Sequence, residues 1–98
     1  MKKFAYPQSY LLMIRRYLDE KKQRCFTYRG LRSWMYRQKE YRDLEWHTVE
    51  RTIRKLVEDR LLERVELKKN QVIFCWTEAA ERIVRITLES IYGNEQFR

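Results

Sequence analysis

The sequence contains only two glycines and one proline among its 98 residues. These residues interrupt helices and form turns, so their scarcity indicates a mostly helical chain with short connections. Two glycines also leave little room for a glycine-rich loop that cradles phosphate groups. No apolar run approaches the roughly 20 residues that a membrane-spanning helix needs, and no signal-peptide pattern is visible. We therefore expect one intracellular, cytoplasmic domain with no membrane partner.

Side chains that bind metals or catalyse reactions are equally scarce. One histidine and two cysteines cannot supply the four ligands of a structural zinc site without acidic help, and no close ligand spacing is present. No arrangement of serine, histidine and acid suggests nucleophilic catalysis. The sequence therefore predicts no metal, no cofactor, no small-molecule ligand and no enzymatic activity.

What the chain has in excess is positive charge. Its formal net charge is +8, and 44% of its residues are hydrophobic, which is enough for one modest core. Most of the excess lies in residues 21–42, where Lys21, Lys22, Arg24, Arg29, Arg32, Arg37, Lys39 and Arg42 stand against Glu40 alone. Such a block favours a polyanionic partner, and a basic surface kept for solubility is the alternative.

The stretch from Leu44 to Val65 combines an amphipathic helix with a strand. On a helical wheel the apolar side consists of Val49, Ile53, Leu56 and Val57. The opposite side consists of His47, Thr48, Arg51, Arg54, Lys55 and Glu58. The helix should end near Asp59–Arg60. A strand over about 62–68 should follow, with Val65 and Leu67 inward and Arg64, Glu66 and Lys68 outward.

The remaining elements can be placed on either side of this stretch. We expect a helix over 7–21, a brief strand over 24–27, and a helix over 28–38 capped by Thr27. Tyr28, Leu31, Trp34 and Met35 should face inward on that second helix, and Arg29, Arg32, Ser33, Tyr36 and Arg37 outward. A second hairpin strand should cover 71–76. With a two-residue turn at Lys69–Asn70, Leu67 would face Val72 and Val65 would face Phe74.

The last helix is predicted over 77–92, capped by Thr77 and ended by Gly93. Its apolar residues cover roughly 200° of the helix surface, well beyond the ~100° stripe that packing on one surface needs. A second copy of the same helix would cover the excess through one repeated interface. The residues predicted for that dimer interface are Ile83, Val84, Thr87, Leu88 and Ile91.

The order of these elements resembles that of winged helix-turn-helix DNA-binding regulators over residues 7–92. His47-Thr48-Val49, then Ile53, Leu56 and Leu61-Leu62, matches the pattern of their recognition helix and first wing strand. The segment FCWTEAA from Phe74 to Ala80 is similar to the end of the wing in MarR-like and PadR-like regulators. Arg60 and Ala80 depart from it, because many such proteins carry glycine there. Small winged-helix proteins of archaea and archaeal viruses are similar in size and tyrosine content.

The resemblance implies a transcriptional regulator that binds double-stranded DNA as a homodimer. The third helix would enter the major groove, and the second helix would contact phosphates. The DNA-binding residues that follow are His47, Thr48, Arg51, Arg54 and Lys55 on the third helix, Arg29, Arg32, Arg37, Lys39 and Arg42 on or after the second, and Lys68 and Lys69 on the wing.

Several of these residues have a simpler interpretation. His47 could be an ordinary surface residue, Arg51 and Arg54 could pair with Glu50 and Glu58, and Lys68 and Lys69 could simply protect a hairpin tip. The three tryptophans lie on inner faces, where core packing is expected over base stacking.

The resemblance also brings the two cysteines together. In a winged helix the first short strand pairs with the last wing strand, and Cys25 and Cys75 lie in those two strands. Free thiols are the default in a reducing cytosol, and a disulfide is the alternative.

Two other functions remain open. The third helix is nearly neutral, which fits a winged-helix module that binds proteins without touching DNA. Exposed tyrosines such as Tyr36 and Tyr41 would fit RNA or single-strand binding.

Overall fold

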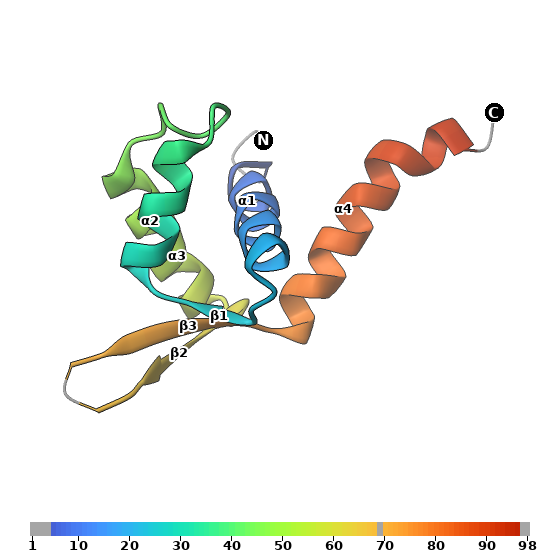
Figure 1. Cartoon of the computed structure of the whole chain (residues 1–98). Coiled ribbons are helices and arrows are strands. Elements are labelled where there is room, and N and C mark those ends of the chain that lie inside the picture. Colours follow the sequence, from blue (N-terminus) through green and yellow to red (C-terminus); the bar gives the residue numbers. More distant parts are fainter. Residues whose placement is uncertain (1–4, 69, 97–98) are drawn as a thin grey trace.

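The computed structural model describes residues 5–68 and 70–96, and the surroundings of the side chains in 9–68 and 70–90. The described residues form an α+β structure with the predicted order of elements (Figure 1). The elements are α1 (Ala5–Lys21), β1 (Cys25–Phe26), α2 (Tyr28–Arg37), α3 (Trp46–Glu58), β2 (Leu62–Glu66), β3 (Val72–Trp76) and α4 (Glu78–Gln96). Within the described ranges, no helix is both long enough and apolar enough to cross a membrane.

The core lies among α1, α2 and α3 and is closed on one side by the sheet. On α3 the predicted inward residues Val49, Ile53 and Leu56 are completely buried, while Val57 is only partly buried. Burying a side chain of this size contributes about 1.5–3 kcal/mol. Because one face of α3 is fixed in the core, its opposite face must point to solvent.

Threonine hydroxyls begin two of the helices, as the sequence predicts. Thr27 Oγ1 accepts a hydrogen bond from the Gly30 amide at 3.0 Å, and Thr77 Oγ1 accepts one from the Ala80 amide at 3.1 Å. The Thr77 hydroxyl also donates to the Leu61 carbonyl at 2.8 Å, which joins the start of α4 to the end of α3. Glu45 occupies the N-cap position of α3, but its side chain makes no capping hydrogen bond.

The turns that usually require glycine are made here by other residues. Lys22, Arg60 and Asn70 have positive φ angles of 55°, 63° and 61°, while Gly30 lies inside α2. At the end of α3, the Arg60 amide donates to the Val57 carbonyl at 3.0 Å and the Leu61 amide to the Leu56 carbonyl at 2.8 Å. This is the Schellman arrangement that normally has glycine in the left-handed position. Arg60 therefore adopts the left-handed conformation that glycine usually provides at this position.

The hairpin register differs from the prediction by one residue. In the antiparallel sheet, whose order is β1-β3-β2, Val65 pairs with Ile73 and Arg64 pairs with Phe74. The Leu67 amide donates to the Gln71 carbonyl at 2.7 Å, so the turn contains three residues, 68–70, and not two. Asn70 supplies the left-handed conformation that such a turn needs.

The corrected register changes which side chains point inward. Arg64 lies on the same side of the sheet as buried Phe74. The sequence pattern instead predicts Arg64 on the outward side. Leu67 was expected to point inward, but it lies beyond the strand and is 47% exposed. Both strands are also shorter than predicted, because β2 ends at Glu66 and β3 begins at Val72.

Cys25 and Cys75 are cross-strand partners on β1 and β3, with Cα atoms 4.0 Å apart, and they form a disulfide. The default expectation of two free thiols does not describe this structure. The disulfide ties the strand that precedes α2 to the strand that leads into α4.

The last helix continues through Gly93 to Gln96, so the prediction that it ends at Gly93 is wrong. A glycine inside a helix costs about 1 kcal/mol without ending it, because its amide can still be bonded. Ala80 and Val84 pack in the chain's own core, and Val84 is 1% exposed, which removes Val84 from the predicted dimer interface. Toward its C-terminal end α4 diverges from α1 (Figure 1), and Ile86 is 64% exposed.

Candidate nucleic-acid interface

The exposed face of α3 carries the residues predicted to contact DNA. His47, Arg51 and Lys55 follow one another at one-turn spacing along this face, and all three are exposed. Thr48 is partly buried, and its carbonyl accepts a hydrogen bond from the Thr52 hydroxyl at 2.9 Å. The stripe made by His47, Arg51 and Lys55 therefore faces solvent and contains no acidic residue.

The alternative in which Arg51 and Arg54 pair with Glu50 and Glu58 is not found among the ion pairs of the described side chains. At the start of α3, His47 Nδ1 lies 3.9 Å from Glu50 Oε1, which is an ion pair when the imidazole is protonated, and at its end Lys55 pairs with Asp59 at 3.7 Å. Both involve exposed groups and contribute little to stability. Arg51 and Arg54 appear in none of the ion pairs found within the described residues.

A basic hollow lies beside this stripe, between α2 and the start of α3. Its volume is about 380 Å³. It is lined by Tyr28, Arg29, Arg32, Ser33, Tyr36, Trp46 and Glu50. The Arg32 guanidinium lies over two rings, 5.7 Å from the centre of Tyr36 and 5.6 Å from that of Trp46. Two cation–π contacts, to rings on α2 and α3, therefore restrict its orientation.

A larger groove of about 1000 Å³ separates α3 from the β2–β3 hairpin. Its lining residues are Thr27, Tyr28, Arg29, Glu50, Arg54, Val57, Glu58, Arg64, Asn70, Gln71, Val72 and Phe74. Arg64 was missed at the sequence level, because only the correct turn length places it on the groove side. The groove mixes three guanidinium groups with two carboxylates, so its charge is close to balanced.

The pKa of Tyr28 reflects the charges that line this groove. Burial raises the pKa of the Tyr28 phenol, and the Glu50 carboxylate raises that pKa further. The guanidinium groups of Arg54 and Arg64 lower the pKa. Charges on α3 and β2 thus act on one phenol at the start of α2.

The basic block of residues 21–42 does not form one surface. Lys21, Lys22 and Arg24 lie at the end of α1 and before β1, away from the hollow. Arg37 lies close enough to Tyr17 of α1 to lower the pKa of that phenol, which burial raises.

The other predicted basic residues also lie apart. Lys39 and Arg42 are exposed in the connection between α2 and α3, and Lys68 is exposed in the hairpin turn. Lys69 lies outside the described residues. Among the basic residues that were predicted to contact phosphates from α2 and the connection after it, only Arg29 and Arg32 line the hollow.

A second aromatic cluster shows what Tyr41 does. The Arg16 guanidinium lies 5.6 Å from the centre of the Tyr41 ring and 5.9 Å from that of Trp34, and its Nη1 donates to Glu40 Oε2 at 3.0 Å. The Glu40 backbone amide and Arg16 lower the pKa of the Glu40 carboxyl. Tyr41 is partly buried and anchors the connection, which weakens the proposal that it stacks on single-stranded bases.

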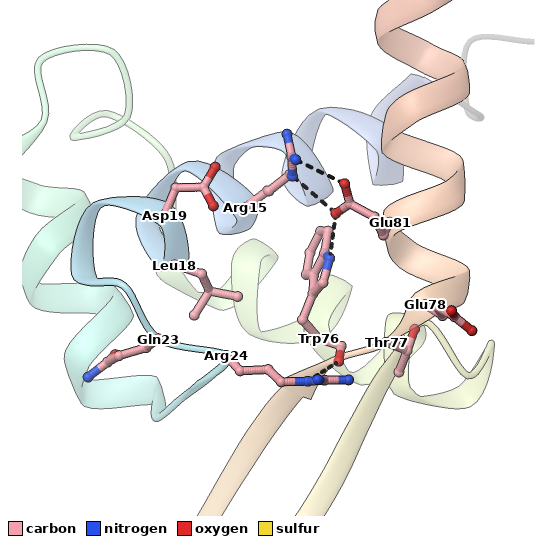
Figure 2. Close-up of a pocket in the computed structure, with 9 residues that line it drawn as sticks. All are labelled: Arg15, Leu18, Asp19, Gln23, Arg24, Trp76, Thr77, Glu78 and Glu81. Atoms are coloured by element: carbon pink, nitrogen blue, oxygen red, sulfur yellow. Dashed lines mark hydrogen bonds and ion pairs between the residues drawn. The ribbon is translucent and has the colours of Figure 1, made fainter.

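The base of α4 is held by a cluster of charged and aromatic side chains (Figure 2). Arg15 donates two hydrogen bonds to Glu81, at 3.1 and 2.9 Å, and Trp76 Nε1 donates to the same carboxylate at 3.0 Å. A cavity of about 300 Å³ lies beside them. Because Glu81 already accepts these three bonds, the cluster fixes the direction in which α4 leaves β3.

The described side chains contain no group of three or more histidine, cysteine or acidic residues able to hold a metal ion. Of the predicted dimer residues, Ile83, Thr87 and Leu88 are partly buried, and the Ile91 side chain lies outside the described residues. No protein-family model matches the chain, and no curated protein or solved structure is similar enough to be a match.

Proposed function

We propose that this protein is a winged helix-turn-helix regulator that binds double-stranded DNA. The exposed stripe of His47, Arg51 and Lys55 on α3 carries the proposal, because the buried face of the same helix leaves it pointing outward. A helix of this kind fits the major groove, and guanidinium groups can bond guanine edges or phosphates. Arg29 and Arg32 on α2 then supply contacts to the backbone.

A titration of labelled duplex DNA tests this proposal. Arg51→Ala should weaken binding, while Arg82→Ala on α4 is the matched control, since Arg82 is also exposed and lies on another element. An unlabelled single strand of the same sequence should displace the labelled duplex from the protein poorly. Equal affinity of both variants, or a preference for the single strand, would contradict duplex binding through α3.

Two copies are proposed to assemble through α4. The helix diverges from the body, and Ile86 is exposed on it. A two-fold dimer would present two α3 helices to half-sites one helical turn apart, about 34–36 Å. Ile86→Glu should shift the sedimentation coefficient toward that of a monomer, and Arg82→Glu should not. If the natural protein sediments as a monomer, the proposed dimer through α4 is refuted.

The charge of the groove favours a second candidate, a protein-binding module. Glu50 and Glu58 line the groove beside Arg29, Arg54 and Arg64, and carboxylates repel DNA phosphates. Glu50→Gln separates the two functions, because removing this charge should tighten binding to any duplex but should weaken binding to a basic protein surface. Capture of partners from a nuclease-treated extract gives the complementary test, because only a protein partner survives the nuclease.

A further inference from the structure

We infer that the hollow between α2 and α3 is the seat of one DNA phosphate, with Arg32 as its main ligand and Tyr36 as the residue that positions Arg32. This inference rests on the proposed duplex binding. It adds a role for Tyr36, an exposed aromatic side chain that core packing does not explain.

Tyr36 is unusual for its place in the fold. It is 41% exposed on the outer face of α2, one turn after Arg32, and its ring is not part of the buried core. The Arg32 Cζ lies 5.7 Å from its centre and 5.6 Å from the centre of Trp46, which begins α3. The two rings come from different helices, so the guanidinium contacts both α2 and α3.

A guanidinium whose rotamers are already restricted binds an anion more tightly, because less side-chain entropy is lost on binding. An exposed arginine has many rotamers, and fixing it on a ligand costs about 2 kcal/mol of side-chain entropy at most. Two aromatic faces restrict those rotamers before the phosphate arrives, while the N–H groups at the guanidinium edge stay available. Within the described residues, Arg32 takes part in none of the ion pairs that would occupy those donors.

The other residues of the hollow fit a phosphate ligand. Arg29 and the Ser33 hydroxyl lie on the same face of α2, one turn before and one residue after Arg32. Glu50 lies on the opposite, α3 side of the hollow, and its negative charge would repel a phosphate there. Its side chain is 32% exposed. A phosphate would therefore sit on the α2 side of the hollow, close to Arg32.

A double-mutant cycle in duplex binding tests the inference. Arg32→Ala should reduce the salt slope of binding by about 0.9, the value for one phosphate contact. Tyr36→Leu should weaken binding about threefold, which is the scale of an exposed cation–π contact, and Tyr36→Phe should bind like the natural protein because it keeps the ring. In the Arg32→Ala background, Tyr36→Leu should have no further effect.

Each other outcome has a definite meaning. Equal losses for Tyr36→Leu with and without Arg32, or a loss for Tyr36→Phe equal to that for Tyr36→Leu, would overturn the positioning role. An unchanged salt slope in Arg32→Ala would overturn the phosphate seat while leaving duplex binding intact. Failure of the natural protein to bind any duplex would refute the proposed function and the inference together. Thermal unfolding of each variant checks that exposed Tyr36 can be replaced without loss of the fold.

Discussion

The hydroxyl of Tyr17 on α1 lies where a side chain on Gly30 would begin. A Cβ atom added to Gly30 would be 2.7 Å from Tyr17 Oη and 3.3 Å from Thr27 Oγ1. Glycine is therefore present inside α2 because α1 approaches so closely, despite its low helix propensity. α2 therefore packs closely on α1 at the position between Arg29 and Arg32.

Gly30→Ala should lower the free energy of unfolding by up to about 2 kcal/mol, because an overlap that costs about 1–3 kcal/mol outweighs the roughly 1 kcal/mol gained in helix propensity. In a Tyr17→Phe background the same change should cost less or become stabilising, since the overlapping oxygen is gone. Urea unfolding of the four proteins gives the coupling energy. Additive effects would show that the contact does not explain the glycine.

Arg60→Gly should raise the free energy of unfolding by about 0.5–1 kcal/mol. Arg60 has a φ of 63°, which costs an L-residue about 1–2 kcal/mol, and part of the gain is offset by the greater freedom of glycine in the unfolded chain. Arg82→Gly within α4 is the control and should destabilise by about 1 kcal/mol. A loss of stability in Arg60→Gly would mean that the arginine side chain makes a contact that outweighs its backbone strain.

Reduction of the Cys25–Cys75 disulfide should destabilise the protein by up to about 4 kcal/mol, the loop-entropy value for a sequence separation of 50 residues. Unfolding with and without a dithiol reductant measures the difference. A Cys25→Ser, Cys75→Ser protein serves as the control, because the reductant should not change its stability. If the natural protein is equally insensitive, the bond contributes nothing to the folded state.

Stability should fall at alkaline pH as the buried phenols titrate. Burial raises the pKa of Tyr17 and Tyr28, so their neutral forms are favoured in the folded state. The stability that they contribute is complete below about pH 10, the ordinary tyrosine pKa, and is lost as the pH rises through the raised values. Tyr28→Phe should lose less stability over this range. A spectrophotometric titration in which Tyr28 ionises at or below the ordinary value would contradict this prediction.

The sequence predicts the α3 face well because the pattern there is long and unambiguous. Val49, Ile53 and Leu56 recur at helical spacing, and each is completely buried. The inward and outward faces of α2 were also predicted correctly, and both threonine caps are made. In each case short-range chemistry decides the outcome.

The hairpin and α4 were harder for an equally physical reason. A single residue in the turn changes every pairing, and the three-residue turn becomes evident only from the strand register and the left-handed Asn70 of the folded structure. The place of Arg64 in the groove could not be predicted without that register. Gly93 resembled a helix end, and no local pattern distinguishes a terminal glycine from one inside a continuing helix. The contact of Arg32 with Trp46 depends on how α2 and α3 pack, which no local pattern contains.

We propose that the exposed face of α3, flanked by the arginines of α2, binds the DNA backbone and bases. The most direct test is the affinity for a duplex measured across a series of salt concentrations. We predict a linear fall of log affinity with log salt concentration, with a slope of about −0.9 for each phosphate contacted, reduced by removal of Arg29 or Arg32. A flat line for the natural protein would contradict the claim.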